Sequence, residues 1–321
     1  MTVPAQSNPL NPITPARDFS VMTSGNTTLV STASQGAVAA GGNFVFRNWF
    51  NVATSASSNL TLPGETGTTG LLVGGNIDLA TSSDGNLRVS QGFAHTGALT
   101  GTAAQTYGSE VHVVRSGTAS NDNWSTPRVI VSADQTNQTA NAVLKTGVFP
   151  FSNTFVLLNA YAKRMGQLDP STCSGIVYPQ FYEQNNNPNN WVLHLSKNKV
   201  NVLNVTSSQL AGISGVTGPQ NPSSDTPLVI NITDVGPVTI PTTWWTQWQN
   251  GDWSSIIWNV PNSTSVTLTT NSTLYGSLYA PSAAVSMSNV QVNGDIVAAS
   301  LTTNGGAINL RHFTASIPCV A

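Results

Sequence analysis

Short apolar runs separated by glycine, asparagine, serine and threonine recur along this chain from Asp18 onward. The runs return roughly every 8–12 residues, a spacing typical of domains built from many short strands. Two pairs of segments repeat one plan: Gly36–Phe44 matches Gly70–Ile77, and Gly276–Val285 matches Gly294–Leu301. One such unit cannot bury its apolar side, whereas stacked units can. The pattern predicts a mainly β chain folded as a right- or left-handed β-solenoid; a β-sandwich would explain the same strand density.

One segment departs from this β pattern. In residues 152–166 the apolar positions fall at helical spacing. Ser152 is the expected N-cap, and Gly166 is expected just beyond the last turn. We therefore predict one amphipathic helix packed along the solenoid through an apolar face of Phe155, Leu158, Ala162 and Met165.

The ends of the chain predict its domain organisation. Residues 1–16 contain four prolines and read as an extended arm or linker. Residues 17–321 are then a single β-solenoid domain, long enough to bury a sizeable core. No segment approaches the roughly 20 consecutive apolar residues that a membrane-spanning helix requires.

Charged residues are unusually scarce and make up 7% of the chain, against about 25% in an average soluble domain. Serine, threonine, asparagine and glycine replace them, as in many extracellular β proteins. The formal net charge is −2, which gives no electrostatic footprint for nucleic acid or an anionic membrane. We expect an extracellular protein, attached to a cell surface or cell wall.

The two cysteines, Cys173 and Cys319, lie far apart in the sequence. In an oxidising compartment they can form a disulfide that fastens the last strand. Two buried free thiols are the alternative. Neither arrangement suggests redox chemistry.

The amino-acid sequences and the order of several segments resemble those of the choice-of-anchor A family of secreted surface proteins. The resemblance implies a β-solenoid head attached to a wall or membrane, and it brings no catalytic residues. This chain departs from the family pattern in lacking an anchor and in being rich in tryptophan before residue 258. The matching segments are Gly36–Phe44, Phe151–Leu168, Pro227–Thr233, Ile256–Thr267, Gly276–Ala283, Val292–Leu301 and Arg311–Phe313.

The segment 243–253 concentrates tryptophan beside glutamine and asparagine. Flat indole faces next to amides suit stacking on sugar rings combined with hydrogen bonds to hydroxyls. One hypothesis is a contact patch for an extracellular glycan or matrix protein; the alternative is that the indoles seal the solenoid core. The patch would comprise Trp244, Trp245, Trp248 and Trp253.

The acidic residues show no pair at a catalytic spacing, and the four histidines show no metal-binding spacing. Asp78 and Asp84 flank a turn and could hold Ca²⁺, although ordinary turn chemistry explains them as well. We therefore expect no enzyme activity and no cofactor. The scattered carboxylates are Asp78, Asp84, Glu110, Asp234, Asp252 and Asp295.

An internal amide crosslink between side chains is a further possibility for a surface protein. It would require a buried lysine held against an asparagine and an acid. Lys145, Lys163, Lys197 and Lys199 are the candidates, and Lys197 and Lys199 share one face of a strand-like run.

These observations favour an adhesin or display domain without catalysis that attaches to host matrix, a glycan or neighbouring cells. The alternatives are a self-assembling envelope or matrix protein, an ice-binding solenoid and a carbohydrate-active enzyme. Ice binding would require threonines in register on successive rungs. The sequence offers only Thr267–Thr270 and Thr302–Thr303 as hints, without a visible register.

Overall fold

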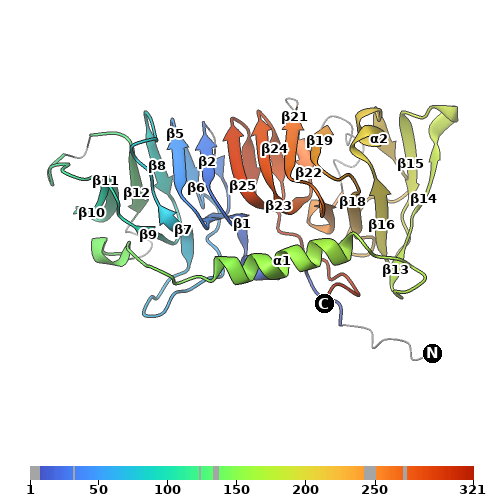
Figure 1. The fold of residues 1–321 in the computed structure, drawn as a ribbon, viewed down its shortest axis with the longest axis horizontal. Coiled ribbons are helices and arrows are strands. Elements are labelled where there is room, and N and C mark those ends of the chain that lie inside the picture. The colour runs from blue at the N-terminus through green and yellow to red at the C-terminus, as the bar shows by residue number, and fades with distance from the viewer. Residues whose placement is uncertain (1–7, 32, 123, 133–136, 242–250, 270–272) are drawn as a thin grey trace.

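The computed structural model describes residues 8–321 except 32, 123, 133–136, 242–250 and 270–272. Within these residues the chain forms an elongated β-solenoid, with one long helix lying along its side (Figure 1). Successive coils pair through parallel strands. The predicted solenoid is confirmed, and the sandwich alternative is wrong.

The solenoid has three faces and a small sheet at one end. The helix face contains β13 (Ile176–Val177), β16 (Val200–Val205), β18 (Leu228–Ile232), β20 (Ile256–Asn259), β23 (Ser277–Ser288), β25 (Ile296–Asn304), β1 (Phe19–Thr23), β4 (Ala37–Ala40), β7 (Thr69–Asn76) and β9 (Phe93–Ala98). The second face contains β19 (Pro237–Pro241), β21 (Ser265–Thr269), the last residues of β23 and β25, β2 (Thr27–Val30) and β5 (Phe44–Arg47).

The third face and the end sheet complete the coil. The third face contains β22 (Thr273–Tyr275), β24 (Gln291–Asn293), β26 (Ala307–Asn309), β3 (Ala33–Ser34), β6 (Phe50–Val52), β8 (Asn86–Val89), β12 (Arg128–Ser132), β11 (Glu110–Arg115) and β10 (Thr102–Tyr107). The end sheet contains β14 (Gln180–Glu183), β15 (Asn190–His194) and β17 (Gly215–Thr217). Antiparallel pairs, β10 with β11 and β14 with β15, lie at the two ends of the molecule (Figure 1).

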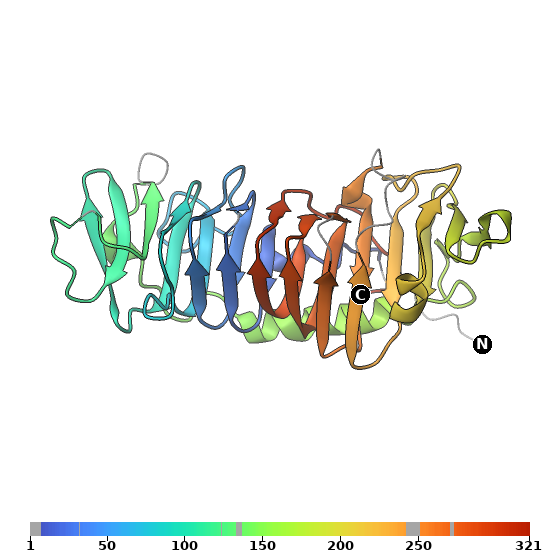
Figure 2. The same cartoon turned by 90° about the horizontal axis from the view of Figure 1, so that it is seen from above.

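The first and last coils of the chain meet in the middle of the molecule. Strand β1 pairs with β25 on one side and with β4 on the other. The chain coils outward from β1 to β12, crosses to the opposite end through a segment that contains helix α1 (Phe151–Met165), and coils back from there to β25 (Figure 2). Neighbouring rungs near the centre therefore come from opposite ends of the sequence.

The internal repeats occupy adjacent rungs. Val38 pairs with Leu71 in one pair of repeats, and Leu278 pairs with Ile296 in the other. At one corner the Asn76 backbone N–H donates to Asn43 Oδ1 over 2.9 Å, and the Asn43 N–H donates to Asn26 Oδ1 over 2.8 Å. These asparagines thus connect one rung to the next, which stabilises the stack at its turns.

Helix α1 packs through the apolar face that the sequence predicts. Phe155, Leu158, Ala162 and Met165 are all buried. The predicted N-cap is wrong: Pro150 holds that position without a side-chain cap, and Ser152 lies inside the helix. Burial of the apolar face decides where the helix begins, because packing contributes more to helix stability than a cap does.

Polar side chains of the sheet fix the position of α1. Asn231 Nδ2 donates to Met165 O and Asn259 Nδ2 donates to Ala162 O, each over 2.9 Å. One rung further, Tyr279 Oη donates to Leu158 O over 3.0 Å. A buried amide without a partner costs about 1–3 kcal/mol, so these bonds favour one position of the helix along the sheet.

Two further regions differ from the expected organisation. Helix α2 (Ser207–Ala211) stands where only strands were expected; its capping box joins Thr206 and Gln209. The described part of the proline-rich arm packs against the domain. Leu10 forms a bridge with Ile317, and a short 3-10 helix (Thr14–Ala16) follows it. None of the helices in the described residues is long and apolar enough to span a membrane.

Asp295 anchors the C-terminal segment from inside the molecule. The carboxylate is fully buried, and its Oδ1 lies 2.6 Å from His312 Nδ1. Its Oδ2 accepts hydrogen bonds from Ser277 Oγ and from the Phe313 N–H. Burial disfavours charge on His312, but the hydrogen bond and charge of Asp295, together with the charge of Asp18, raise its pKa. The folded state therefore holds the His312 proton more tightly than the unfolded chain does.

This raised pKa predicts that the domain loses stability at alkaline pH. The contribution of His312 is fully present below the unfolded pKa of about 6.5 and is lost as pH rises through the higher folded value. Urea unfolding from mildly acidic to mildly alkaline pH should show this decline in wild type and a weaker one in His312→Gln. The same decline in both proteins would contradict the role of His312.

Candidate functional site

The second face of the solenoid alternates strictly between core and surface. Val266 and Leu268 of β21 point inward and are buried, and Val285 and Met287 of β23 do the same. The residues between them face outward, because successive side chains of a strand point to opposite sides of the sheet. The outward positions of this face carry mainly hydroxyl side chains.

Strand register brings five of these hydroxyls into one row. Thr239 pairs with Thr267, Thr267 with Ser286, Ser286 with Thr302, and Thr302 with Thr28. All five side chains are at least partly exposed. We call this set, Thr239, Thr267, Ser286, Thr302 and Thr28, the hydroxyl row.

The surroundings of the hydroxyl row are uncharged and mix polar with small apolar side chains; Pro237, Pro241, Ala284 and Val30 are apolar. Ser265 and Ser300 lie two residues before row members on β21 and β25, and Ser288 and Asn304 lie two residues after row members on β23 and β25. The row ends beside Val45 of β5. Two residues along the same strand, Arg47 is the first charge on this face. The row together with Ser265, Ser288, Ser300 and Asn304 forms a patch that we call the hydroxyl face.

The hydroxyl face is held in place by its own backbone. Parallel pairing on both sides fixes β21, β23 and β25, and the inward side chains belong to the main core. Neighbouring strands lie about 4.8 Å apart, and alternate residues of a strand lie about 6.6 Å apart. The face is therefore a preorganised lattice of hydroxyl groups, which can meet a rigid periodic surface with little loss of side-chain freedom.

The predicted tryptophan patch is not brought together within the described residues. Trp244, Trp245 and Trp248 lie outside them. Trp253 begins a 3-10 helix and is partly buried against Tyr275, with ring centroids 4.9 Å apart. The Arg311 guanidinium lies 5.9 Å from the Trp253 ring centroid. Trp253 therefore packs against neighbouring side chains, and whether the tryptophan segment binds a ligand or seals the core stays a prediction.

Five of the six candidate carboxylates make separate structural contacts; Glu110 lies 3.2 Å from Arg88 and 3.0 Å from His112. Asp78 accepts hydrogen bonds from Ala80 and Thr81 of its own turn, and these bonds lower its pKa. Asp234 accepts from Ser207 at the start of α2, and Asp252 caps the 3-10 helix at Trp253–Ser255. Among the described residues, no three histidine, cysteine, aspartate or glutamate side chains gather as a metal site. The Asp78 carboxylate is occupied by its own turn, as ordinary turn chemistry explains.

An open pocket of about 440 Å³ lies beside the C-terminal segment. Asp225 is the single acidic residue of its described lining, and Lys199 is the single basic one. The paired acids of a glycoside hydrolase do not meet there.

The hydroxyl row includes residues that sequence reasoning overlooked. The sequence indicated Thr267 and Thr302 as members of a possible threonine array, but it did not indicate Thr239, Ser286 or Thr28. Thr239 and Ser286 each lie between two buried apolar residues, and Thr28 precedes the buried Leu29. Alternation of this kind identifies outward positions on one strand, but it does not identify the neighbouring rung.

Comparison with known proteins gives one family and two solved structures. The family model described as "Putative Ice-binding-like adhesive domain" matches residues 12–310. A glycosylated ice-binding protein from an Arctic yeast is similar at 12% identity and a TM-score of 0.38, over 92% of this chain and 91% of that chain. An ice-binding protein from the Antarctic ascomycete Antarctomyces psychrotrophicus gives 10% identity and a TM-score of 0.34, over 94% and 98%. Curated proteins give no match.

Proposed function

The chain belongs to the family of ice-binding-like adhesive domains, and from this premise we propose that it attaches to an ordered solid surface through the hydroxyl face. Ice is the surface to test first. It presents water molecules in a fixed lattice, and hydroxyl groups can replace or bind such molecules. The resulting function is adhesion without catalysis.

The in-register hydroxyl row carries this proposal. A row of five similar groups on one rigid face has no use in binding a single small molecule, which requires a concave site. Against a periodic surface, each contact repeats and the contacts act together, as in multivalent binding. The absence of charge among the five row members suits a neutral lattice.

The hydroxyl row makes a direct prediction for mutants. Ser286→Tyr and Thr302→Tyr should each lower binding to ice at least about tenfold, because a bulky ring holds the neighbouring hydroxyls away from the surface and tenfold corresponds to only about 1.4 kcal/mol. Both residues are exposed, so stability should change by less than about 0.5 kcal/mol. Partition of labelled protein into growing ice and thermal hysteresis measure the binding.

Asn51→Tyr is the matched control. Asn51 is exposed in the middle of β6 on the third face, so the same ring is added away from the hydroxyl row. Its ice partition should equal that of wild type. Crystalline cellulose and chitin form a second arm of the experiment, because they are ordered hydroxyl surfaces of another kind. Failure of wild type to bind ice and both polysaccharides would refute attachment through this face.

Three properties support an extracellular setting for this adhesion. The chain contains a disulfide, which persists in oxidising compartments. Few of its residues are charged, and five of the six candidate carboxylates, all except Asp84, contact neighbouring protein groups. We expect that the full-length gene encodes an anchor, as the resemblance to the choice-of-anchor A family predicts. The glycan or matrix contact through the tryptophan segment stays a prediction, tested by an array with Trp245→Ala/Trp248→Ala.

A further inference from the structure

Three ionisable side chains meet near the outer end of the first half of the solenoid, away from the hydroxyl face. Glu65 lies in the connection between β6 and β7, His95 in β9, and Lys145 in the segment that follows a short 3-10 helix (Ala140–Ala142). Glu65 Oε2 is 3.1 Å from His95 Nε2, and Glu65 Oε1 is 3.5 Å from Lys145 Nζ. The carboxyl group therefore lies between an amine and an imidazole.

Burial sets this group apart from ordinary surface ion pairs. The exposed fractions of the Glu65, His95 and Lys145 side chains are 5%, 0% and 28%. Glu65 Oε1 is buried without a hydrogen-bond partner, so its only polar contact within the described residues is the Lys145 amine at the longer distance. A carboxylate buried in this way is costly unless it is paired or neutralised.

The backbone holds the three groups in place. The Lys145 N–H donates to Thr96 O over 2.9 Å, which attaches the lysine to the strand that carries His95. His95 Nδ1 lies 3.1 Å from Ala142 O, and its ring stacks on Phe93. Reacting groups fixed at short distance gain a large effective concentration.

The imidazole is arranged to share a proton with Glu65. Because Ala142 O can only accept, His95 Nδ1 carries hydrogen, and the contact between Nε2 and Oε2 then requires one further proton. Burial lowers the pKa of His95 to about 4. Burial also raises the pKa of Glu65, although the nearby positive charge of Lys145 opposes this. These directions place the shared proton on the carboxyl group, where it makes Glu65 a neutral acid.

We propose that Lys145 and Glu65 condense to an internal amide bond, with His95 as the proton relay. Lys145 Nζ forms a bond to Glu65 Cδ, the bond from Cδ to Oε2 breaks, and Oε2 leaves as water. Counted from the Lys145 ammonium and the neutral Glu65 acid, Nζ loses two protons; His95 Nε2 passes one of them to Oε2, which leaves as water, and the other goes to solvent. Charge and atoms balance, and no oxidant or co-reactant is needed.

This crosslink differs from the one expected from sequence. The electrophile is a glutamate in place of an asparagine, and a histidine stands where the acid was expected. Lys197 and Lys199, which share a face in the sequence pattern, are both exposed. The amide would tie the loop before β7 to the segment before α1, and so fasten the outer coils of an adhesive domain against pulling. The proposal holds whether or not the hydroxyl face binds ice.

Intact mass of the purified full chain under denaturing conditions tests the crosslink. Wild type should be lighter than its sequence mass by one water, beyond the two hydrogens lost to the disulfide. Proteolysis should yield a branched peptide that joins the segments containing Glu65 and Lys145. Lys145→Arg and Glu65→Ala should each show their own sequence mass less the two disulfide hydrogens, without the loss of water. His95→Gln should lose the water more slowly after synthesis than wild type does.

Lys163→Arg is the matched control, because Lys163 is exposed on α1 and its replacement should leave the loss of water intact. The wild-type measurement decides the question even if a variant fails to fold. A wild-type mass equal to the sequence mass less the disulfide hydrogens would overturn the proposal. A loss of water that peptide mapping places at other residues would overturn it equally.

Discussion

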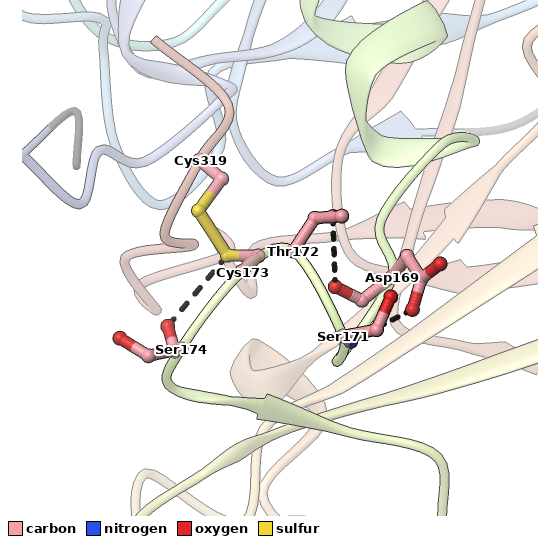
Figure 3. The surroundings of a disulfide bond; sticks show 6 residues. All are labelled: Asp169, Ser171, Thr172, Cys173, Ser174 and Cys319. Carbon is pink, nitrogen blue, oxygen red and sulfur yellow. Dashed lines mark hydrogen bonds between the residues drawn. A yellow bond between two sulfur atoms is a disulfide. The ribbon is translucent and has the colours of Figure 1, made fainter. Parts of the chain in front are cut away.

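Replacing Cys173 and Cys319 together with serine is expected to lower the free energy of unfolding by about 5 kcal/mol. The two residues form a disulfide across 146 positions of sequence (Figure 3). A loop of this length loses much conformational freedom in the unfolded chain, and the chain-entropy model gives its stabilising effect as about 5 kcal/mol. Few single features of a domain contribute as much, since a whole domain is stable by only about 5–15 kcal/mol.

The disulfide also joins two specific parts of the fold. Cys173 follows the turn after α1, in which Asp169 O accepts from the Cys173 N–H, and Cys319 lies in the C-terminal segment. Nearby, Arg164 Nη1 donates to Val320 O over 3.1 Å. The predicted disulfide is confirmed, but it fastens the C-terminal segment beyond the last strand, and not that strand itself, to the region after the long helix.

Urea unfolding of wild type and the double variant measures this effect. Wild type in reductant should approach the stability of the variant, while reductant should leave the variant itself unchanged. A difference of less than about 1 kcal/mol between the oxidised wild type and the variant would contradict the chain-entropy explanation for this loop.

Trp258→Ala is expected to lower the free energy of unfolding by about 3–5 kcal/mol. Trp258 lies in β20 and is fully buried in the main core. Its indole Nε1 donates to Tyr275 O over 2.9 Å. The substitution would leave a large cavity in the centre of the second half of the solenoid and remove the donor from a backbone carbonyl.

Trp124→Ala is the appropriate control, because Trp124 is 86% exposed and its loss should change stability by less than about 0.5 kcal/mol. Urea unfolding compares the two variants directly. Similar effects at both sites would mean that indole size alone, independent of burial, decides the cost.

Much of the local structure could be predicted because it depends on short patterns. The buried face of α1 follows from helical spacing, and the paired repeats on adjacent rungs follow from their matching glycines and β runs. Helix α2 was missed although its capping box, Thr206 with Gln209, is visible in the sequence. The N-cap of α1 was misplaced because packing, not a capping side chain, sets the start of that helix.

The candidate site was much harder to predict. Thr302 and Thr28 are neighbours in the hydroxyl row, yet they come from opposite ends of the chain. The carboxyl, imidazole and amine of Glu65, His95 and Lys145 likewise come from three separate segments. No spacing rule connects residues in these positions, because each rung contributes a single member.

The sequence by itself determined that the chain forms many short β strands in repeating units, that one amphipathic helix packs on them, and that two cysteines can form a disulfide; it favoured a solenoid over a sandwich. These features depend on periodicity and residue type within short segments. Only the tertiary structure decided which rungs are neighbours, because α1 carries the chain back along the solenoid and places the last coil against the first. The hydroxyl row is complete only when the last coil pairs with the first, since packing of the whole core sets the strand register between distant segments.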